Sequence, residues 1–352
     1  MKLKNLYKTL IISLTLFGTV SGQDIHFSQF YRTPLLINPA LAGTFTGNHR
    51  AFINYRNQWK SVGTPYKTFA FAYDMPFYKK QWKGGHLGAG LFAFNDNAGT
   101  NNLSTTQINL SLSGIVLINS QQKVSVGLQG GLTQMSINYG NARWGNQFQN
   151  NSYNPNASPR ESNLNNEPAY HGDINAGLSW RYAKTETNIS SKDQLSATAG
   201  ISFFHINQPK QKLFSGQIDR LYTKLVIHGS ANIGLKGLNS FFIPSLVFYR
   251  QGKTTEFTGG ALIRYRIKEE SRYTGFIKES SISLGLHYRH LDAMIPSVIL
   301  DISGFSVGIS YDINISRLTE ASSGRGGIEI SLKYINPSPY KYRRTKSSAP
   351  MF

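Results

Sequence analysis

The groups that could do acid–base or metal chemistry in this sequence are eight histidines and 18 carboxylates, since the chain contains no cysteine. No Asp or Glu occurs between Asn97 and Arg160, so that stretch cannot supply the pair of carboxylates that such acid–base catalysis requires. The histidines lack the spacing of metal ligands; His287 and His290 are three residues apart in a strand-like run, which places them on opposite faces. We therefore expect no catalytic, cofactor-binding or metal-binding residues and predict that the protein is not an enzyme.

Two glycine-rich stretches resemble parts of phosphate-binding loops. They are Gly88-Ala89-Gly90 and residues 127–131. Neither has the lysine and the following helix that a phosphate loop requires. Close packing or bending of strands explains these glycines better.

Beyond residue 50 the dominant pattern is an alternation of apolar with small or polar residues, in runs of about ten. The alternation predicts strands over residues 50–58, 66–75, 86–95, 104–117, 122–138, 171–183, 195–205, 223–235, 240–250, 255–267, 280–290, 293–301, 304–313 and 326–335. An even number of such long strands favours an all-β fold, a transmembrane antiparallel barrel of about 14 strands. A soluble β-sandwich or propeller would also alternate, but sandwich strands are typically only ~5–6 residues long.

The formal net charge is +19, from 37 Lys and Arg against 18 Asp and Glu. The basic residues are scattered through the strand-like runs instead of forming one stripe, which argues against nucleic-acid binding. In a barrel, a cation on the lipid face costs ~2–4 kcal/mol near the bilayer midplane. We therefore expect most cations to face the lumen or the rims, including Arg56, Arg181, Arg264, Arg266 and Arg289.

The first 22 residues have the features of a cleavable signal peptide. Lysines precede an apolar run from Leu10 to Val20, and cleavage after Gly22 would leave a chain that starts at Gln23. A short membrane anchor is the alternative, although the run falls short of the ~20 residues a spanning helix needs. The expected organisation is a signal peptide (1–22), an N-terminal plug or periplasmic segment (23–49), the transmembrane barrel (50–335) and a basic periplasmic tail (336–352).

The stretch from Phe27 to Gly43 fits neither the two-residue period of a strand nor a capped helix. Irregular backbone cannot face lipid, because its polar groups would stay unsatisfied there. Its many apolar side chains make open water unfavourable as well. We therefore expect a plug in the barrel interior or at the periplasmic mouth, with Pro34 and Pro39 preventing regular pairing and Gly43 turning the chain toward the first strand.

Two segments outside the strands are candidates for contacts with partner proteins. If the mature N-terminus is periplasmic, the long connections 139–170, 206–222 and 314–325 all face the cell exterior. The first is rich in Asn and carries aromatic residues that suit a recognition loop, namely Tyr139, Trp144, Phe148 and Tyr153. The tail is the candidate periplasmic contact, through Tyr340, Lys341, Tyr342, Arg343 and Arg344. The alternatives are a solvated loop with no special role and a functionless end.

Several short motifs lie between residues 24 and 74. In the expected plug they comprise Phe27, Ser28, Gln29, Tyr31, Asn38, Pro39, Ala40 and Gly43. In the first predicted hairpin they comprise Asn54, Tyr55, Arg56, Gln58, Trp59, Pro65, Tyr66 and Asp74. Together these motifs resemble the start of the PorP/SprF family of Bacteroidota outer-membrane proteins, which are associated with type IX secretion and gliding motility. Beyond about residue 75 the likeness is one of pattern and length.

The resemblance implies an integral outer-membrane barrel that receives or retains a secreted surface protein, such as an adhesin with a C-terminal sorting domain. It also implies contacts with membrane lipid and with periplasmic components of the type IX machinery. The opening stretch resembles, more loosely, the N-terminal hatch of the fourteen-stranded FadL-like barrels. That second likeness implies an alternative function, a channel for a small hydrophobic ligand.

Overall fold

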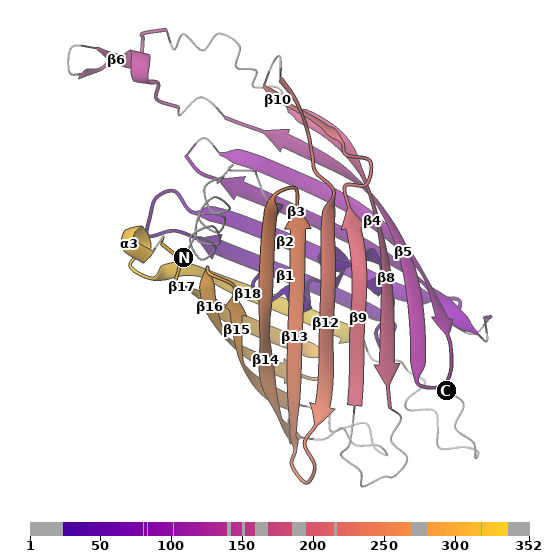
Figure 1. Cartoon of the computed structure of the whole chain (residues 1–352). Helices are drawn as coiled ribbons and strands as arrows, with labels where there is room; N and C mark the ends of the chain where they lie inside the picture. Colours follow the sequence, from indigo (N-terminus) through magenta and orange to yellow (C-terminus); the bar gives the residue numbers. More distant parts are fainter. Residues whose placement is uncertain are drawn as a thin grey trace, which may run out of the picture.

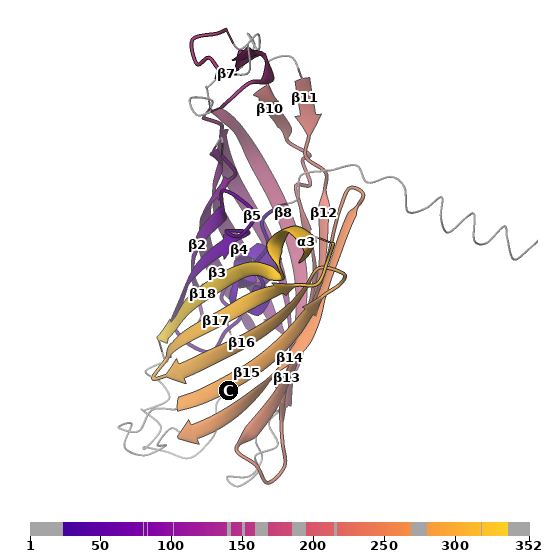
Figure 2. The same ribbon diagram turned by 90° about the vertical axis from the view of Figure 1, so that its left-hand side faces the viewer.

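The alternating runs form fourteen long antiparallel strands, and the last of them pairs with the first, which closes a barrel (Figures 1 and 2). The barrel strands are β1 (His49–Gln58), β2 (Tyr66–Phe77), β3 (Gly85–Ala98), β4 (Leu103–Leu117), β5 (Gln122–Ser136), β8 (Ala169–Ala183), β9 (Leu195–Phe204), β12 (Lys224–Gly234), β13 (Ser240–Gln251), β14 (Thr254–Lys268), β15 (Ser280–Arg289), β16 (Ala293–Ile302), β17 (Phe305–Asn314) and β18 (Arg325–Asn336). Each predicted strand is confirmed to within three residues at either end.

The computed structural model describes residues 24–79, 81–82, 84–100, 102–138, 142–149, 152–158, 168–184, 195–214, 217–268, 280–317 and 319–336. The expected signal peptide, Tyr139 and the tail beyond Asn336 lie outside this part of the chain. Within the described residues, no helix has the length and apolar character to cross a membrane.

The two faces of the barrel wall differ in polarity. On β17, Val307 and Ile309 are exposed on the outer face, whereas Ser310 and Asp312 are buried on the inner face. The same alternation runs through β4, β5, β15 and β18. An apolar outer face around a polar interior is the arrangement of a transmembrane barrel. A soluble sandwich buries its apolar faces instead, so that alternative is wrong.

The arginines that we expected inside all occupy inner-face positions, which confirms the prediction. Arg56 and Arg289 are almost fully buried. Arg181 donates a hydrogen bond to the backbone of Thr44, inside the barrel. Arg264 and Arg266 alternate along β14 with side chains that are exposed on the outer face.

Two prolines interrupt the hydrogen-bonded ladder of the wall. Pairing of β12 with β13 stops at Ser230 and resumes at Ile233, opposite Pro244 and its neighbour. Pairing of β16 with β17 is interrupted in the same way beside Pro296. Proline has no backbone N–H to donate, so the neighbouring strand loses a partner at each site.

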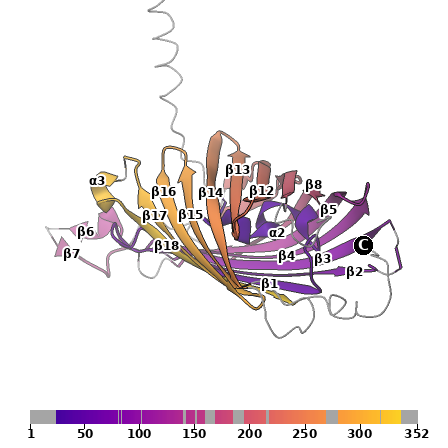
Figure 3. The same cartoon turned by 90° about the horizontal axis from the view of Figure 1, so that it is seen from below.

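Residues 24–48, the N-terminal segment, lie along the inner face of the wall, and Figure 3 shows α2 inside the curve of the strands. The segment forms three short turns of helix, η1 (Phe30–Arg32), α2 (Pro34–Ile37) and η2 (Pro39–Leu41). Pro34 and Pro39 occupy the first positions of α2 and η2, where the missing N–H breaks no hydrogen bond of the helix.

The apolar side chains of the segment pack against two opposite parts of the wall. Phe27 and Leu35 join a buried cluster with residues of β1, β2 and β3. Phe30 and Ile37 join a second cluster with residues of β9, β12 and β13. Because β1 and β12 are half the barrel apart, the segment reaches across the lumen.

The connections after β5, β9 and β17 contain the remaining elements: η4 (Gly145–Gln147), β6 (Phe148–Gln149), β7 (Ser152–Tyr153), β10 (Lys210–Phe214), β11 (Gln217–Arg220) and α3 (Thr319–Ser322). These connections leave the barrel at one end, called the loop end below, because the three strands run in the same direction. Figure 2 shows β7, β10 and β11 together beyond it. They are the connections that we expected outside the cell, and this orientation in the membrane stays a prediction.

Candidate functional site

The N-terminal segment begins near the loop end, where Asp24 contacts side chains of the wall. Nε2 of His205, the residue after β9, lies 2.6 Å from Asp24 Oδ2, and its Nδ1 lies 2.9 Å from Asp173 Oδ1. Lys224 Nζ lies 3.5 Å from Asp24 Oδ2. Although burial of the ring opposes protonation, the two carboxylates raise the pKa of His205 to about 9. Burial likewise opposes ionisation of Asp24, but Lys224 and His205 hold its pKa well below the ordinary value.

Ser28 and Gln29 dock on the acidic side chains of the last two strands. Their backbone N–H groups donate to the two carboxylate oxygens of Glu329, at 2.7 and 3.0 Å. Ser28 Oγ donates to Asp312 Oδ1 at 2.6 Å and accepts a hydrogen bond from Arg289 at 2.7 Å. Each of these side chains is buried, so the contacts are made out of water. The Phe-Ser-Gln motif of the sequence is therefore a docking motif for the barrel interior.

Asp312 is the centre of a buried ion network. Nη2 of Arg56 and Nη1 of Arg289 lie 2.8 and 3.1 Å from its Oδ2. All three side chains are almost fully buried. Removing one member of such a network would leave an uncompensated charge in a low-dielectric interior.

The Asn-Pro-Ala motif fits the middle of the segment to the wall. The Asn38 side chain accepts a hydrogen bond from Ala40 N and donates one to Leu178 O of β8, both at 2.9 Å. Ser125 Oγ of β5 donates to Ala40 O at 2.8 Å. Beside these contacts, Gly127 has no room for a side chain, since a Cβ there would overlap the Ala40 backbone. Close packing is thus confirmed as the reason for this glycine.

Asp74 anchors the end of the segment to the first hairpin. Gly43, whose φ of +66° lies in the left-handed region, donates from its N–H to Asp74 Oδ2 at 2.7 Å. Nε and Nη2 of Arg50 each donate to one Asp74 oxygen at 2.8 Å. The chain then enters β1 at His49. Gly43 therefore turns the chain toward the first strand, as predicted.

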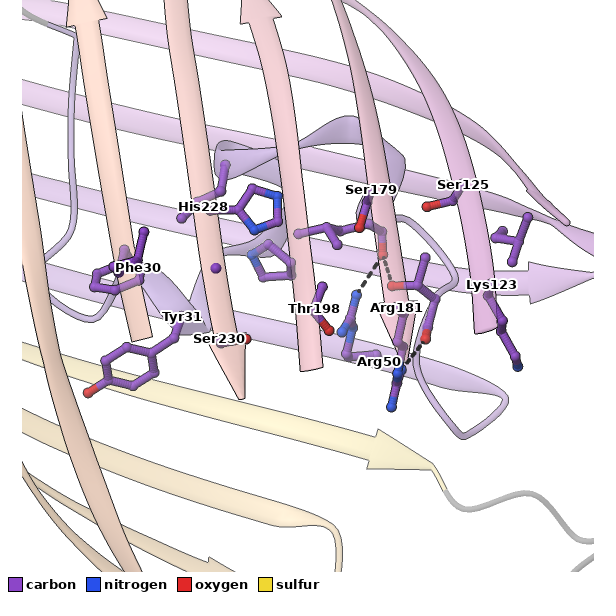
Figure 4. A pocket seen from close by; sticks show the side chains of 17 residues that line it. Phe30, Tyr31, Arg50, Lys123, Ser125, Ser179, Arg181, Thr198, His228 and Ser230 are labelled. Atoms are coloured by element: carbon purple, nitrogen blue, oxygen red, sulfur yellow. Dashed lines mark hydrogen bonds between the residues drawn. The ribbon is translucent and has the colours of Figure 1, made fainter. Parts of the chain in front are cut away.

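A cavity of about 260 Å³ remains between the N-terminal segment and β5, β8, β9 and β12 (Figure 4). Phe30 and Tyr31 line one side, and the cations Arg50, Lys123 and Arg181 line the other. Burial raises the pKa of Tyr31 to about 12, so its phenol is neutral at physiological pH. The cavity is an interior pocket with an apolar side and a cationic side.

The remaining motif residues of the first hairpin divide between the interior and the rim. Asn54 is buried on the inner face of β1, and Tyr55 lies on the outer face. Gln58, Trp59, Pro65 and Tyr66 lie at the turn of the hairpin. The rings of Trp59 and Tyr66 are 4.9 Å apart in an edge-to-face arrangement.

The aromatic residues of the long connection after β5 lie apart from the interior site. Figure 1 shows β6 well beyond the loop end of the barrel. The rings of Phe148 and Tyr153 are 6.3 Å apart, and Arg143 lies over the Tyr153 ring at 5.1 Å. Phe148 is largely exposed, and Trp144 precedes the same hairpin. Tyr139 and the tail residues Tyr340, Lys341, Tyr342, Arg343 and Arg344 lie outside the described residues.

Sequence reasoning missed the acidic partners of the interior site. Asp312 and Glu329 both occupy inner-face positions in strands whose outer faces are apolar. A carboxylate at such a position is a signal in itself, because a buried charge needs a partner. His205 gives no comparable signal, since it stands just outside a strand and meets Asp24 only in the fold. Among the described residues, no group of three His, Asp or Glu side chains is arranged to hold a metal ion.

The sequence matches a protein-family model over residues 19–334. That family is described as type IX secretion system membrane protein PorP/SprF, a membrane component of a secretion system. No curated protein matches the chain.

Several solved structures are similar to the barrel at low sequence identity. The CymD monoaromatic hydrocarbon channel is 10% identical, over 87% of this chain and 93% of that chain, with a TM-score of 0.47. A deltaS2 mutant of the TodX monoaromatic hydrocarbon channel is 9% identical, over 87% and 94%, with a TM-score of 0.44. BamA from Haemophilus ducreyi lacking POTRA domains 1–3 is 10% identical, over 82% and 70%, with a TM-score of 0.41. The expected likeness to FadL-like barrels is found in the two channels, and at these values it carries no information about function.

Proposed function

Because the chain belongs to the PorP/SprF family of type IX secretion system membrane proteins, we propose that it receives or retains a secreted surface protein for this machinery. The observation that carries the proposal is the family match, which extends over residues 19–334 and so includes the whole barrel. The closed fourteen-stranded wall with its apolar outer face supports a place in the outer membrane, among membrane lipids. Export would depend on the signal peptide at residues 1–22.

The N-terminal segment acts as the plug of the barrel. Its contacts extend from His205 and Lys224 near the loop end to Asp74 and Arg50 at the opposite end. Its apolar side chains pack on both sides of the lumen. A barrel occupied in this way supports holding a protein partner at a rim better than passing it through the lumen.

The secreted partner binds at the loop end, through the hairpin formed by β6 and β7. Trp144, Phe148 and Tyr153 lie there among asparagines, and rigid aromatic rings beside adaptable amides make effective recognition surfaces. The basic tail, which includes Tyr340 and Arg343, would meet the periplasmic components of the machinery from the other side of the membrane.

The alternative function is passage of a small hydrophobic ligand through the barrel. The apolar side of the interior cavity, at Phe30 and Tyr31, favours it. Passage would require the N-terminal segment to leave the wall, which breaks the two buried hydrogen bonds from Ser28 and Gln29 to the Glu329 carboxylate. Asp312 and Asp74 would keep their arginine partners on the wall, but Glu329 would lose both of these donors, and this cost favours the cargo-holding function.

Detergent extraction of the full chain, tagged and expressed in its own host, tests the proposal. Mass spectrometry of the purified material should identify a large secreted surface protein with a C-terminal sorting domain, together with periplasmic components. Recovery of the barrel alone under gentle extraction would contradict a cargo-holding function.

A variant of the hairpin formed by β6 and β7 tests whether the secreted protein binds there. Replacing Trp144, Phe148 and Tyr153 together by alanine should lower recovery of the surface protein about tenfold or more, because aromatic anchors dominate binding energies. The matched control is Trp82→Ala, since Trp82 is an exposed aromatic residue in the turn between β2 and β3, at the opposite end of the barrel. Equal losses in both variants would mean that the hairpin is not the contact.

A further inference from the structure

The interior cavity has two chemically distinct sides. The apolar side comes mainly from the N-terminal segment, through Phe30, Pro34 and Ile37. The cationic side comes from three different strands, through Arg50 of β1, Lys123 of β5 and Arg181 of β8 (Figure 4). A pocket with this division suits a ligand that has a negative group at one end and an apolar chain at the other.

The wall leaves much of the cationic side without a countercharge. Arg50 has its carboxylate partner in Asp74. Arg181 donates at 2.6 Å to the backbone oxygen of Thr44, which is a neutral group. Within the part of the chain that the structure describes, no Asp or Glu oxygen lies within 4.0 Å of the Arg181 or Lys123 side-chain nitrogens. Like charges repel strongly away from water, so an anion bound between these two cations would be stabilised.

Hydroxyl groups lie between the two sides of the cavity. Ser179, Thr198 and Ser230 all contribute to the lining, and Figure 4 shows Ser179 and Thr198 close to Arg181. Hydroxyls can donate to a carboxylate alongside the two cations. The cationic side therefore offers both charge and hydrogen-bond donors to one small anionic group.

We propose that this cavity binds a single-chain anionic amphiphile. Its carboxylate lies between Lys123 and Arg181, and its apolar chain packs on Phe30, Pro34 and Ile37. The ligand contacts the wall through its charged end and the N-terminal segment through its chain, so bound ligand fastens the segment to the wall. The proposal is independent of the protein partner proposed above, and a barrel that holds no secreted protein would still have this site.

Calorimetric titration of the full chain in lipid nanodiscs, with empty nanodiscs subtracted, tests the proposal. Three probes separate the contributions: octanoate has the charge and the chain, octanol has the chain alone, and inorganic phosphate has charge alone. We expect saturable binding of one octanoate per barrel. The other two probes should bind at least about tenfold more weakly, because each lacks one of the two groups that the cavity contacts. Octanol binding as tightly as octanoate, or phosphate binding as tightly, would overturn the proposal.

Variants test the assignment of the charged end. Lys123→Gln and Arg181→Gln should each weaken octanoate binding about tenfold, whereas Lys123→Arg keeps the charge and should retain most of the affinity. Lys253→Gln is the matched control, because Lys253 is an exposed lysine in the turn between β13 and β14, at the loop end. An equal loss in Lys253→Gln would mean that octanoate binds through general surface charge, and the proposal would be wrong.

A peptide probe tests whether the bound carboxylate belongs to an amphiphile or to the C-terminus of a polypeptide. A short apolar peptide with a free C-terminal carboxylate shares the chemistry of octanoate but comes from a protein. Octanoate should bind more tightly than this peptide. Tighter binding of the peptide would identify the natural occupant as a polypeptide end and would overturn the assignment to an amphiphile.

Discussion

At the scale of single residues, Asp312 determines how firmly the N-terminal segment is held. It is the shared partner of Arg56, Arg289 and Ser28. Asp312→Asn would leave the buried guanidinium group of Arg56 without its carboxylate, while Arg289 would keep Asp292 and Glu256. Breaking a buried pair costs about 3–5 kcal/mol. We expect the free energy of unfolding to fall by about this amount, measured by denaturant titration of the barrel in lipid.

Asp292 provides the control for this prediction. It pairs with the same Arg289 at 2.9 Å, but its side chain is 43% exposed. Exposed ion pairs contribute about 0–1 kcal/mol, so Asp292→Asn should change the free energy of unfolding by less than about 1 kcal/mol. Similar losses in the two variants would contradict the special role of the buried network.

The contact of His205 with Asp24 makes the start of the segment sensitive to pH. The pKa of His205 is about 9 in the folded chain and about 6.5 in an unfolded one. Because the folded-state pKa is the higher, the stabilisation is fully present below about pH 6.5 and is lost as the pH rises through about 9. Hydrogen-exchange protection factors of residues 24–28 should therefore be lower at about pH 10 than at about pH 6. His205→Gln should remove this difference, and a pH dependence that persists in the variant would exclude His205 as its cause.

At the scale of elements, η2 and β5 fit together only because Gly127 has no side chain. Gly127→Ala would place a Cβ against the Ala40 backbone, and overpacking of this kind typically costs about 1–3 kcal/mol. We expect lower hydrogen-exchange protection of residues 38–42. Gly130, in the same strand, faces open space, so Gly130→Ala is the control and should leave that protection unchanged. Equal protection in both variants would contradict the close packing of η2 on β5.

Elements were predictable from the sequence where their pattern is long. The barrel strands have 10 to 15 residues, and a two-residue period over that length is a strong local signal. The four-residue helix α2 and the two-residue strands β6 and β7 are too short to show any period. The irregular segment from Phe27 to Gly43 was expected inside the barrel by exclusion, since neither lipid nor water suits it.

At the scale of the whole molecule, the N-terminal segment should control ion flow through the barrel. Deletion of residues 27–43 removes the side chains that reach across the lumen, including Phe30 and Leu35. The deleted barrel should conduct ions in a planar bilayer, whereas the full chain should be closed or nearly so. An unchanged, closed barrel after deletion would refute the plug.

The orientation of the barrel can be tested with introduced cysteines, because the chain contains none of its own. Lys253 lies at the loop end and Lys236 at the opposite end, and both are exposed. With the loop end outside the cell, Lys253→Cys should react with a membrane-impermeant maleimide in intact cells, and Lys236→Cys only after the outer membrane is permeabilised. The reverse pattern would invert the orientation and place the aromatic hairpin in the periplasm.

Strand alternation is a local property, so the fourteen strands of the wall and the side chains on its outer face could be predicted from the sequence. The sequence also predicted that the irregular stretch from Phe27 to Gly43, which contains Ser28, Gln29 and Asn38, lies inside the barrel or at its mouth. The partners of these residues were decided only by the tertiary structure. Ser28 meets Glu329 across 301 positions of the chain, and no local pattern contains such a pair. The cavity beside Lys123 and Arg181 is another feature that no local pattern contains. It forms only because closure of the barrel brings strands that are distant in the sequence around the N-terminal segment.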